Sequence, residues 1–277
     1  MKKGLRIAIE VASALGAGAA LAVLAVAPGR AEEEKKAPFM GRNIAHRGLH
    51  TADGSVAENS LTAFTDAMDG GYGIECDVRL TRDGRLVVFH DGDTRRMCAV
   101  PGRIEDMDWP ELARLRLGRT QEGIPLLEDV LRTVGGRVPV VLELKSGARD
   151  AELCRLVYGQ LRRYSGPVCV QSFNPLIVRW WRKNAPEILR GQLSAPAKRL
   201  DGVGPAGAFA LEKLLSNFLC RPQFISYGVC GRKMPLMARL CGALGAMKFC
   251  WTSRDWSAED YADAVIFEFY RPRIRFK

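Results

Sequence analysis

The sequence predicts a single α/β domain, a (β/α)8 TIM barrel with a β-hairpin after the second strand and a hydrophobic helix at the N-terminus. Three observations predict this class. Eight short apolar runs have the length and composition of buried parallel strands, and helix-forming segments alternate with them. The chain has 277 residues, 47% of them hydrophobic, and one barrel typically needs about 250 residues. Alternation at this frequency, with eight strands, favours a closed barrel over an open sheet.

The strands of the barrel are predicted from apolar runs that are rich in Val, Ile and Leu. A ninth run, Leu86–Phe89, follows the second strand after only a few residues, which is too short for the helical crossover that a parallel pair requires. We therefore predict that it returns antiparallel, in a hairpin that turns at Asp83-Gly84. The eight barrel strands are expected at Asn43–His46, Ile74–Val78, Val138–Leu144, Val168–Ser172, Leu189–Leu193, Phe224–Tyr227, Lys248–Thr252 and Val265–Glu268.

Helix-capping signals lie between these strands. Asn59 or Ser60 can cap a helix that ends near Gly70, and Asp108-Trp109-Pro110-Glu111 has the pattern of a capping box with proline in the first turn. Asn174-Pro175 predicts a helix that ends near residue 184, and Ser257 begins the last one.

The N-terminal segment has the pattern of a membrane anchor. Three basic residues precede Val11–Ala27, a span without charge that would reach about 26 Å as a helix, close to the thickness of a thin bilayer core. Ala25-Val26-Ala27 resembles a signal-peptide cleavage site, but Pro28 follows it directly. We expect residues 1–30 to be a membrane anchor or, alternatively, a signal segment of a secreted protein, residues 31–38 to be a charged linker, and residues 39–277 to form the barrel. The side of the membrane stays open.

Composition narrows the range of partners. The formal net charge is +10, from 41 basic and 31 acidic residues, but the chain has no zinc finger, ribonucleoprotein motif or long basic tract, so nucleic acid is not expected as a partner. The tail Phe269–Lys277 alternates aromatic or apolar residues with cations, a pattern that suits an anionic membrane surface. The eight cysteines show no C-x-x-C spacing and are expected to be structural. No obligate protein partner is evident.

All three histidines lie within the first third of the chain, and two of them follow strands. His46 and His90 each end an apolar run, which would place an imidazole at the rim of the barrel. Glu75 and Asp77 are two residues apart on a predicted strand, so both carboxylates point to one face. Together with the guanidinium of Arg47, these groups suit phosphoryl chemistry with a bound divalent cation.

A third carboxylate is expected at the same rim. Val138–Leu144 has the pattern of a buried strand, and it ends in the alternating charges of Glu143 and Lys145. A charged pair at this end of a barrel strand is costly unless it is used. We therefore expect Glu143 to complete a metal site with Glu75 and Asp77.

The order of these motifs resembles the glycerophosphodiester phosphodiesterase family, whose members share the phosphatidylinositol-phospholipase-C-like barrel. The resemblance extends from about Phe39 to Glu268, nearly everything outside the N-terminal segment. It is carried by His46-Arg47-Gly48, Glu58-Asn59-Ser60, Glu75-Cys76-Asp77-Val78, Thr81-Arg82-Asp83-Gly84, Val88-Phe89-His90-Asp91, Glu143-Leu144-Lys145, Gln171-Ser172-Phe173 and Trp251-Thr252.

The resemblance implies hydrolysis of a small glycerophosphodiester to glycerol 3-phosphate and an alcohol. Glu75, Asp77 and Glu143 would hold one divalent cation, Mg²⁺ or Ca²⁺, and His46 and His90 would divide the acid and base roles. The side chains that would bind the substrate are Arg47, Lys145, Glu58, Asn59, Phe173 and Trp251.

The resemblance fails in two places. The family usually closes with Thr-Asp before a proline, whereas this chain has Ile266–Pro272 with Glu268 in that region, which would alter the edge of the pocket or the substrate range. No large insertion follows His90, so no secondary domain is expected to hold a head group. Alternative functions are a lysophospholipase D with a lysophospholipid substrate, a phosphatidylinositol-type phospholipase C, or a non-catalytic binding barrel. His50 falls outside the motifs and is expected to be a loop residue.

Overall fold

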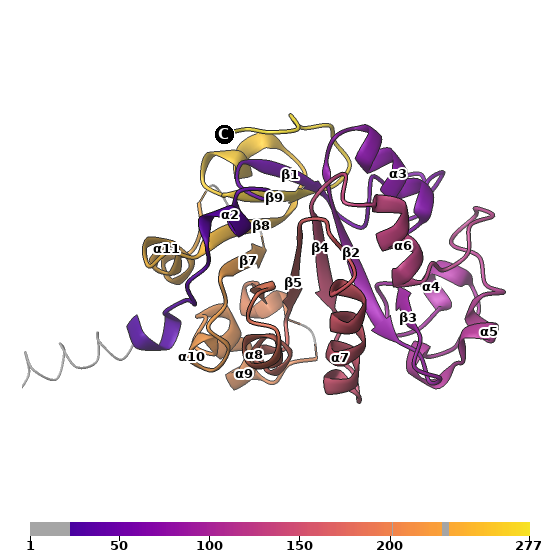
Figure 1. Cartoon of the computed structure of the whole chain (residues 1–277), viewed down its shortest axis with the longest axis horizontal. Helices are drawn as coiled ribbons and strands as arrows, with labels where there is room; N and C mark the ends of the chain where they lie inside the picture. The colour runs from indigo at the N-terminus through magenta and orange to yellow at the C-terminus, as the bar shows by residue number, and fades with distance from the viewer. Residues whose placement is uncertain (1–22, 201, 229–232) are drawn as a thin grey trace, which may run out of the picture.

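Eight parallel strands close into a barrel in the computed structural model, which describes residues 23–200, 202–228 and 233–277 (Figure 1). The first strand pairs with both the second and the last strand, which closes the sheet and confirms the predicted (β/α)8 fold. The barrel strands are β1 (Arg42–Ala45), β2 (Gly73–Leu80), β4 (Val140–Leu144), β5 (Val168–Ser172), β6 (Leu189–Ser194), β7 (Phe224–Gly228), β8 (Met247–Ser253) and β9 (Ala264–Phe267).

The predicted hairpin is also confirmed. Strand β3 (Leu86–Val88) runs antiparallel to β2, and Val78 lies opposite Val88. Gly84 turns the chain with a φ of 80°, a left-handed conformation that glycine adopts at little cost. The chain then runs back along β2, and the N–H of Phe89 donates to the carbonyl of Asp77 at 2.9 Å. The hairpin therefore brings the residue after Phe89, His90, close to the carboxylates of β2.

Helices surround the barrel, and their predicted caps are present. The Ser60 hydroxyl accepts from the N–H of Ala63, the Asn174 side chain accepts from the N–H of Leu176, and Glu111 accepts from the N–H of Asp108. The predicted last helix is a short 3₁₀ helix, η3 (Trp256–Asp260). The other helices are α2 (Glu33–Lys36), α3 (Leu61–Asp69), α4 (Arg95–Cys98), η1 (Ile104–Asp106), α5 (Trp109–Leu112), α6 (Leu127–Val134), α7 (Asp150–Leu161), α8 (Pro175–Asn184), η2 (Ala197–Arg199), α9 (Pro205–Glu212), α10 (Asn217–Cys220) and α11 (Leu236–Ala243).

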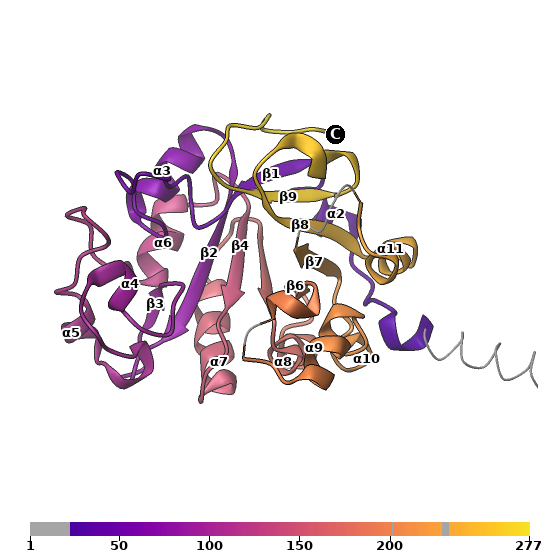
Figure 2. The same cartoon turned by 180° about the vertical axis from the view of Figure 1, so that it is seen from behind.

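The segment between β3 and α6 lies to one side of the barrel. In both views α4 and α5 lie beside the hairpin, on the opposite side of the molecule from α11 (Figure 2). This segment is small, as the sequence predicted, but a side chain of α4 reaches the candidate site described below.

Aromatic side chains fill the N-terminal end of the barrel. Phe224 stacks on Phe249 with 4.4 Å between ring centroids, and Phe39, which precedes β1, lies 6.1 Å from Phe249. All three rings are fully buried. This end is therefore closed, which leaves the C-terminal end of the strands for the site.

The prediction that the N-terminal segment anchors the chain in a membrane is contradicted. No helix within the described residues is both long and apolar enough to span a bilayer. The segment from Val23 onward packs on the barrel instead: Val26 is fully buried, its carbonyl accepts from Asn217, and Arg221 donates to the carbonyls of Leu24 and Ala27. Within it, Val26 is thus buried by protein, whereas Val23 and Leu24 stay exposed. The rest of the predicted anchor, residues 1–22, lies outside the described residues.

The predicted linker and the C-terminal tail both lie against the domain. Residues of the linker form α2, and Lys36 donates to the carbonyl of Gly245. In the tail, the N–H of Phe276 donates to the carbonyl of Gly41 at 2.9 Å, and Tyr72 donates to the carbonyl of Pro272 at 2.7 Å. The tail, whose sequence pattern would also suit a membrane surface, packs beside the start of β1 (Figure 1).

Candidate active site

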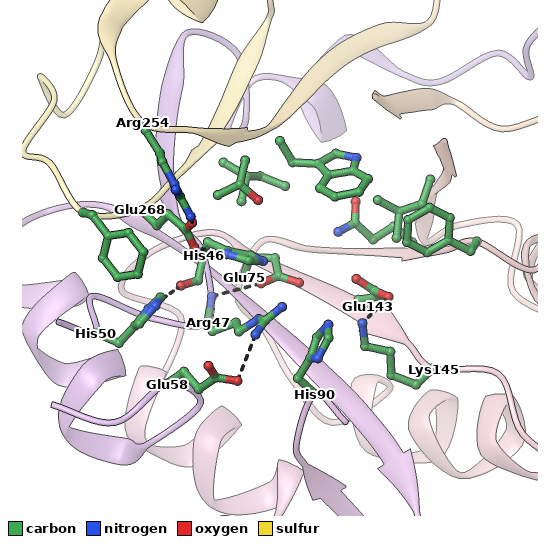
Figure 3. Close-up of a pocket in the computed structure, with 17 residues that line it drawn as sticks. His46, Arg47, His50, Glu58, Glu75, His90, Glu143, Lys145, Arg254 and Glu268 are labelled. Carbon is green, nitrogen blue, oxygen red and sulfur yellow. Dashed lines mark hydrogen bonds and ion pairs between the residues drawn. The ribbon is translucent and has the colours of Figure 1, made fainter. Parts of the chain in front are cut away.

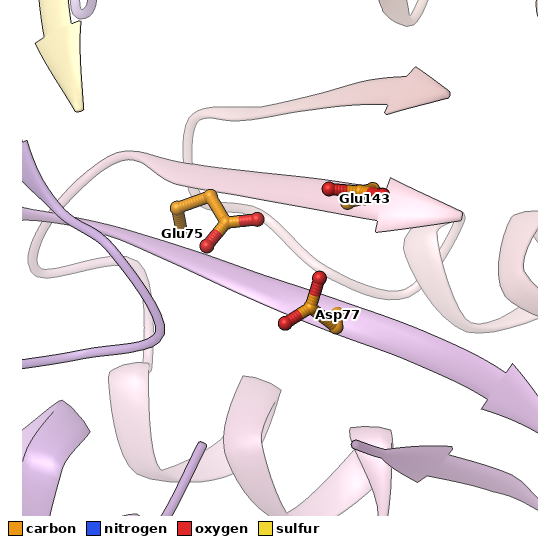
Figure 4. A group of neighbouring side chains, drawn as sticks. All are labelled: Glu75, Asp77 and Glu143. Carbon is orange, nitrogen blue, oxygen red and sulfur yellow. The ribbon is translucent and has the colours of Figure 1, made fainter. Parts of the chain in front are cut away.

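Three acidic side chains converge at the C-terminal half of neighbouring strands. Glu75 and Asp77 alternate along β2, and Glu143 of β4 pairs in register with Asp77 (Figure 4). One oxygen from each lies within 4.8 Å of the others, and all three residues are buried. The structure thus brings together the three predicted metal ligands.

The electrostatics of this cluster suit a bound cation. Burial raises the pKa of Glu75 well above its usual range, and the charges of Asp77 and Glu143 add to the effect. One carboxylate oxygen of Glu75, Oε1, has no hydrogen-bond partner among the residues that the structure describes. Lys145 Nζ lies 2.9 Å from Asp77 Oδ1 and 2.5 Å from Glu143 Oε1. With Glu75, the cluster thus has three carboxylates and one ammonium group. The residues therefore fit a hard divalent cation, which would satisfy the remaining charge and the free oxygen.

Asp77 has the opposite electrostatic balance from Glu75. Burial acts to raise its pKa, but Lys145, His90 and Arg47 outweigh burial and lower it. Asn59 contributes as well, because its amide donates to Asp77 Oδ2 at 2.8 Å. Asp77 is therefore held ionised.

The Arg47 guanidinium is fixed at the edge of the acidic cluster. Its backbone N–H donates to Glu75 at 3.0 Å, and its Nη1 donates to Glu58 at 2.9 Å. Glu58 also accepts two hydrogen bonds from Arg96 of α4, at 2.6 and 2.9 Å. This network presents Arg47 as a rigid donor for an anionic group.

Each of the two predicted catalytic histidines is paired with a carboxylate that is held in turn by an arginine. His46 Nδ1 lies 2.9 Å from Glu268, which accepts from Arg254 at 2.7 and 3.0 Å. His90 Nδ1 lies 2.7 Å from Asp91. Arg96 donates to the second oxygen of Asp91 at 2.6 Å. Since the carboxylates engage Nδ1, Nε2 is the ring atom available for proton exchange.

Burial lowers the pKa of His46, although Glu268 acts in the other direction. For Glu268, burial favours the protonated form, but the hydrogen bonds from His46 and Arg254 outweigh it and bring the pKa to about 2. His46 is therefore neutral near pH 7, beside an ionised carboxylate.

These residues line one cavity of about 400 Å³ (Figure 3). One wall is charged, and the other is apolar, with Leu193, Ile266 and the rings of Phe173 and Trp251, whose centroids are 5.6 Å apart in an edge-to-face arrangement. The predicted site residues that line the cavity are His46, Arg47, Glu58, Glu75, His90, Glu143, Lys145, Phe173 and Trp251. Asp77 and Asn59 do not: both are buried, and Asn59 contacts Asp77 from behind.

Sequence reasoning missed several residues of this site, among them Glu268 and Asp91, the partners of the two histidines. Arg96, on the short helix α4, and Arg254, just after β8, reach it from exposed positions and gave no local signal. His50, expected to be an ordinary loop residue, lines the cavity and pairs with the carbonyl of His46 at 3.0 Å. Gln171 is buried, lines the cavity and pairs in register with Glu143, and its side-chain oxygen has no partner. The alternation of β5 could have revealed Gln171, because it points to the same face as Glu143.

A (β/α)8 barrel whose open end combines an acidic cluster, two carboxylate-bound histidines and a fixed arginine is suited to metal-assisted phosphoryl chemistry. Comparison with known proteins gives the family. The model of the glycerophosphoryl diester phosphodiesterase family matches residues 46–268, and the chain belongs to this family.

Relatives and solved structures agree with this assignment. The chain is 34% identical over 163 residues to a glycerophosphodiester phosphodiesterase of Caldanaerobacter subterraneus subsp. tengcongensis. The aligned region covers 54% of this chain and 65% of the relative. The chain is 37% identical over 113 residues to one from Bacillus altitudinis, covering 38% of this chain and 45% of that one. These matches thus span less than two thirds of either relative's length.

The fold is similar to that of an Oleispira antarctica phosphodiesterase in complex with the product sn-glycerol-3-phosphate. The TM-score is 0.67 at 24% identity, over 84% of this chain and 94% of the other. At this identity the similarity establishes the fold.

Proposed function

We propose that this protein hydrolyses glycerophosphodiesters to glycerol 3-phosphate and an alcohol, with one divalent cation, Mg²⁺ or Ca²⁺. The observation that carries the proposal is the convergence of the acidic cluster, Arg47 and both carboxylate-bound histidines on one cavity. Family membership and the names of the relatives support it.

The charged wall of the cavity is suited to the phosphate. Glu75, Asp77 and Glu143 would hold the cation, which when bound offsets negative charge on the phosphoryl oxygens. Arg47 and Lys145 donate to the non-bridging oxygens and add to this stabilisation where charge develops. Glu58 acts through Arg47, and Asn59 acts through Asp77.

The two histidines divide the proton transfers. As the oxygen of a water molecule bonds to phosphorus, one of its protons passes to Nε2 of His46, whose lowered pKa keeps the ring neutral near pH 7. As the bond from phosphorus to the leaving oxygen breaks, His90 donates a proton to that oxygen, so the alcohol leaves neutral. Glu268 and Asp91 hold the two rings in place through Nδ1.

The apolar wall is suited to the carbon atoms of glycerol. Phe173 and Trp251 contact them, and the unpaired side-chain oxygen of Gln171 accepts from a glycerol hydroxyl. A lysophospholipid would have to leave its acyl chain outside a cavity of about 400 Å³, so the small diester is the favoured substrate.

The test is release of glycerol 3-phosphate by the purified full chain from glycerophosphoglycerol, measured with excess chelator and after adding back Mg²⁺ or Ca²⁺. We expect chelation to abolish release and the cation to restore it, because three buried carboxylates repel one another without it. Full activity in chelator would exclude the cation. Choline release from lysophosphatidylcholine without activity on the diester would favour lysophospholipase D instead.

A further inference from the structure

The carboxylates at the mouth of the cavity are already paired with cations. Outside the acidic cluster, the lining carboxylates within the described residues are Glu58 and Glu268. Glu58 accepts from Arg47 and Arg96, and Glu268 from Arg254 while also pairing with His46. The mouth thus offers no unpaired carboxylate to a positively charged ligand among these residues.

Two aromatic rings at the mouth are in contact with guanidinium groups as well. The carbon of the Arg254 guanidinium lies 5.4 Å from the ring centroid of Phe269, and that of Arg199 lies 5.7 Å from the centroid of Trp251. Both distances are within the range of cation–π contact. A quaternary ammonium group, which proteins commonly bind on aromatic faces, would meet rings that already bear a cation.

Arg254 also keeps donors free. Glu268 engages its Nε and Nη2, whereas its Nη1 makes no hydrogen bond to the residues that the structure describes. The side chain is 69% exposed, lines the cavity and points across its edge (Figure 3). An anionic group of a substrate can therefore reach this nitrogen without displacing Glu268.

We propose that the mouth selects substrates by the charge of their alcohol part: a carboxylate or phosphate group is favoured, a quaternary ammonium group is disfavoured, and Arg254 is the residue that determines this preference. The inference rests on the proposed function and names the substrate class of the same site. An anion gains a charge-assisted hydrogen bond from Arg254. An ammonium group finds both carboxylates at the mouth, Glu58 and Glu268, already paired with arginines.

The first test compares three glycerophosphodiesters of similar size, whose alcohol parts are glycolate, ethylene glycol and choline. We measure kcat/KM of the full chain with its cation by release of glycerol 3-phosphate, a product common to all three. We expect the order glycolate, ethylene glycol, choline, with about a tenfold or larger ratio between the extremes. The ratio should fall as salt is raised, because Arg254 is exposed and its charge is screened.

The second test replaces the arginine. Arg254→Gln should lower the glycolate-to-choline ratio about tenfold, whereas Arg254→Lys, which keeps the charge, should retain most of it. Any weakening of Glu268 and His46 lowers turnover of every substrate and cancels in the ratio. Arg132→Gln is the matched control: Arg132 is 73% exposed, pairs with one carboxylate, Asp129, and lies on α6 outside the cavity, so its loss should leave the ratio unchanged.

Three outcomes would overturn the inference. Equal or faster cleavage of the choline diester by the unmodified protein would do so, as would an unchanged ratio in Arg254→Gln. If none of the three diesters released glycerol 3-phosphate, the proposed function itself would fail and this inference with it, which differs clearly from cleavage without preference.

Discussion

At the scale of single residues, the two histidines share one arrangement built from different parts of the chain. His46 follows β1 and finds its carboxylate after β9, whereas His90 follows β3 and uses the next residue, Asp91. Burial acts to raise the pKa of Asp91, but the hydrogen bonds from His90 and Arg96 outweigh it and lower it. Each carboxylate therefore stays ionised and fixes the tautomer and orientation of its ring.

We expect Asp91→Ala to lower kcat about tenfold or more with little change in KM, because His90 loses the partner that orients it and Asp91 lies outside the cavity lining. His90→Ala should cost about 100-fold. In steady-state kinetics, the double variant should be no slower than His90→Ala, since Asp91 acts through His90.

Asp93→Ala serves as the matched control, because Asp93 is an exposed aspartate two residues away that accepts from the N–H of Arg95 and does not line the cavity. A double variant much slower than His90→Ala would show that Asp91 has a separate role, for example through Arg96 and Glu58.

At the scale of elements, the segment before β1, residues 23–41, packs against the barrel and its helices. Val26 is buried, and its carbonyl accepts from Asn217 of α10 and Cys241 of α11. Phe39 closes the aromatic cluster with Phe249. Backbone contacts hold the segment as well, for example from the N–H of Gly29 to the carbonyl of Pro222. The segment therefore contributes to stability rather than connecting two parts.

We expect Phe39→Ala to lower the free energy of unfolding by about 3 kcal/mol or more, because it removes a fully buried ring and leaves a cavity. Val26→Ala should lower it by a smaller amount, about 1 to 2 kcal/mol. Urea unfolding followed by tryptophan fluorescence measures both. Leu24→Ala is the control, since that side chain is 57% exposed and its loss should change stability by less than about 0.5 kcal/mol. An equal effect of all three variants would contradict this role of the segment.

Features that depend on neighbouring residues could be predicted from the sequence, whereas features that depend on distant residues could not. The run Val168–Ser172 predicts β5 at its observed bounds, because burial on both faces leaves a continuous apolar pattern in the sequence. The apolar run that ends at Ala27 does not predict one structure, since apolar side chains can be buried either in a bilayer or against the protein itself. Arg96 and Arg254 could not be predicted, because they are exposed residues whose roles depend on partners 38 and 14 positions away.

At the scale of the whole molecule, the open end of the barrel concentrates negative charge that destabilises the metal-free protein. The pKa of Glu75 is raised above its usual value of 4.5, so the folded state holds this proton more strongly than the unfolded state does. The stability that this proton contributes is fully present below about pH 4.5 and is lost as pH rises through the folded pKa.

We therefore expect Mg²⁺ or Ca²⁺ to raise the Tm relative to chelator, by an amount that grows as pH rises and Glu75 loses its proton. Glu75→Gln, which mimics the protonated side chain, should remove most of this shift and raise the Tm of the metal-free protein at neutral pH. Calorimetry with and without chelator checks both. Glu128→Gln, an exposed pair with Arg85 outside the acidic cluster, should behave like the unmodified protein, and a metal shift that Glu75→Gln retains would contradict the expectation.

The N-terminal end of the barrel, which aromatic side chains close, is separate from the cavity and can be engineered separately. Phe39 and the tail beside β1 lie at the N-terminal end of the strands, whereas the acidic cluster and both histidines lie toward the opposite end. Libraries confined to residues 23–41 and 272–277 would therefore vary thermal stability, and libraries at Arg254, His50 and Gln171 would vary selectivity. Because few contacts join the two sets, gains selected in separate campaigns should combine additively in one protein.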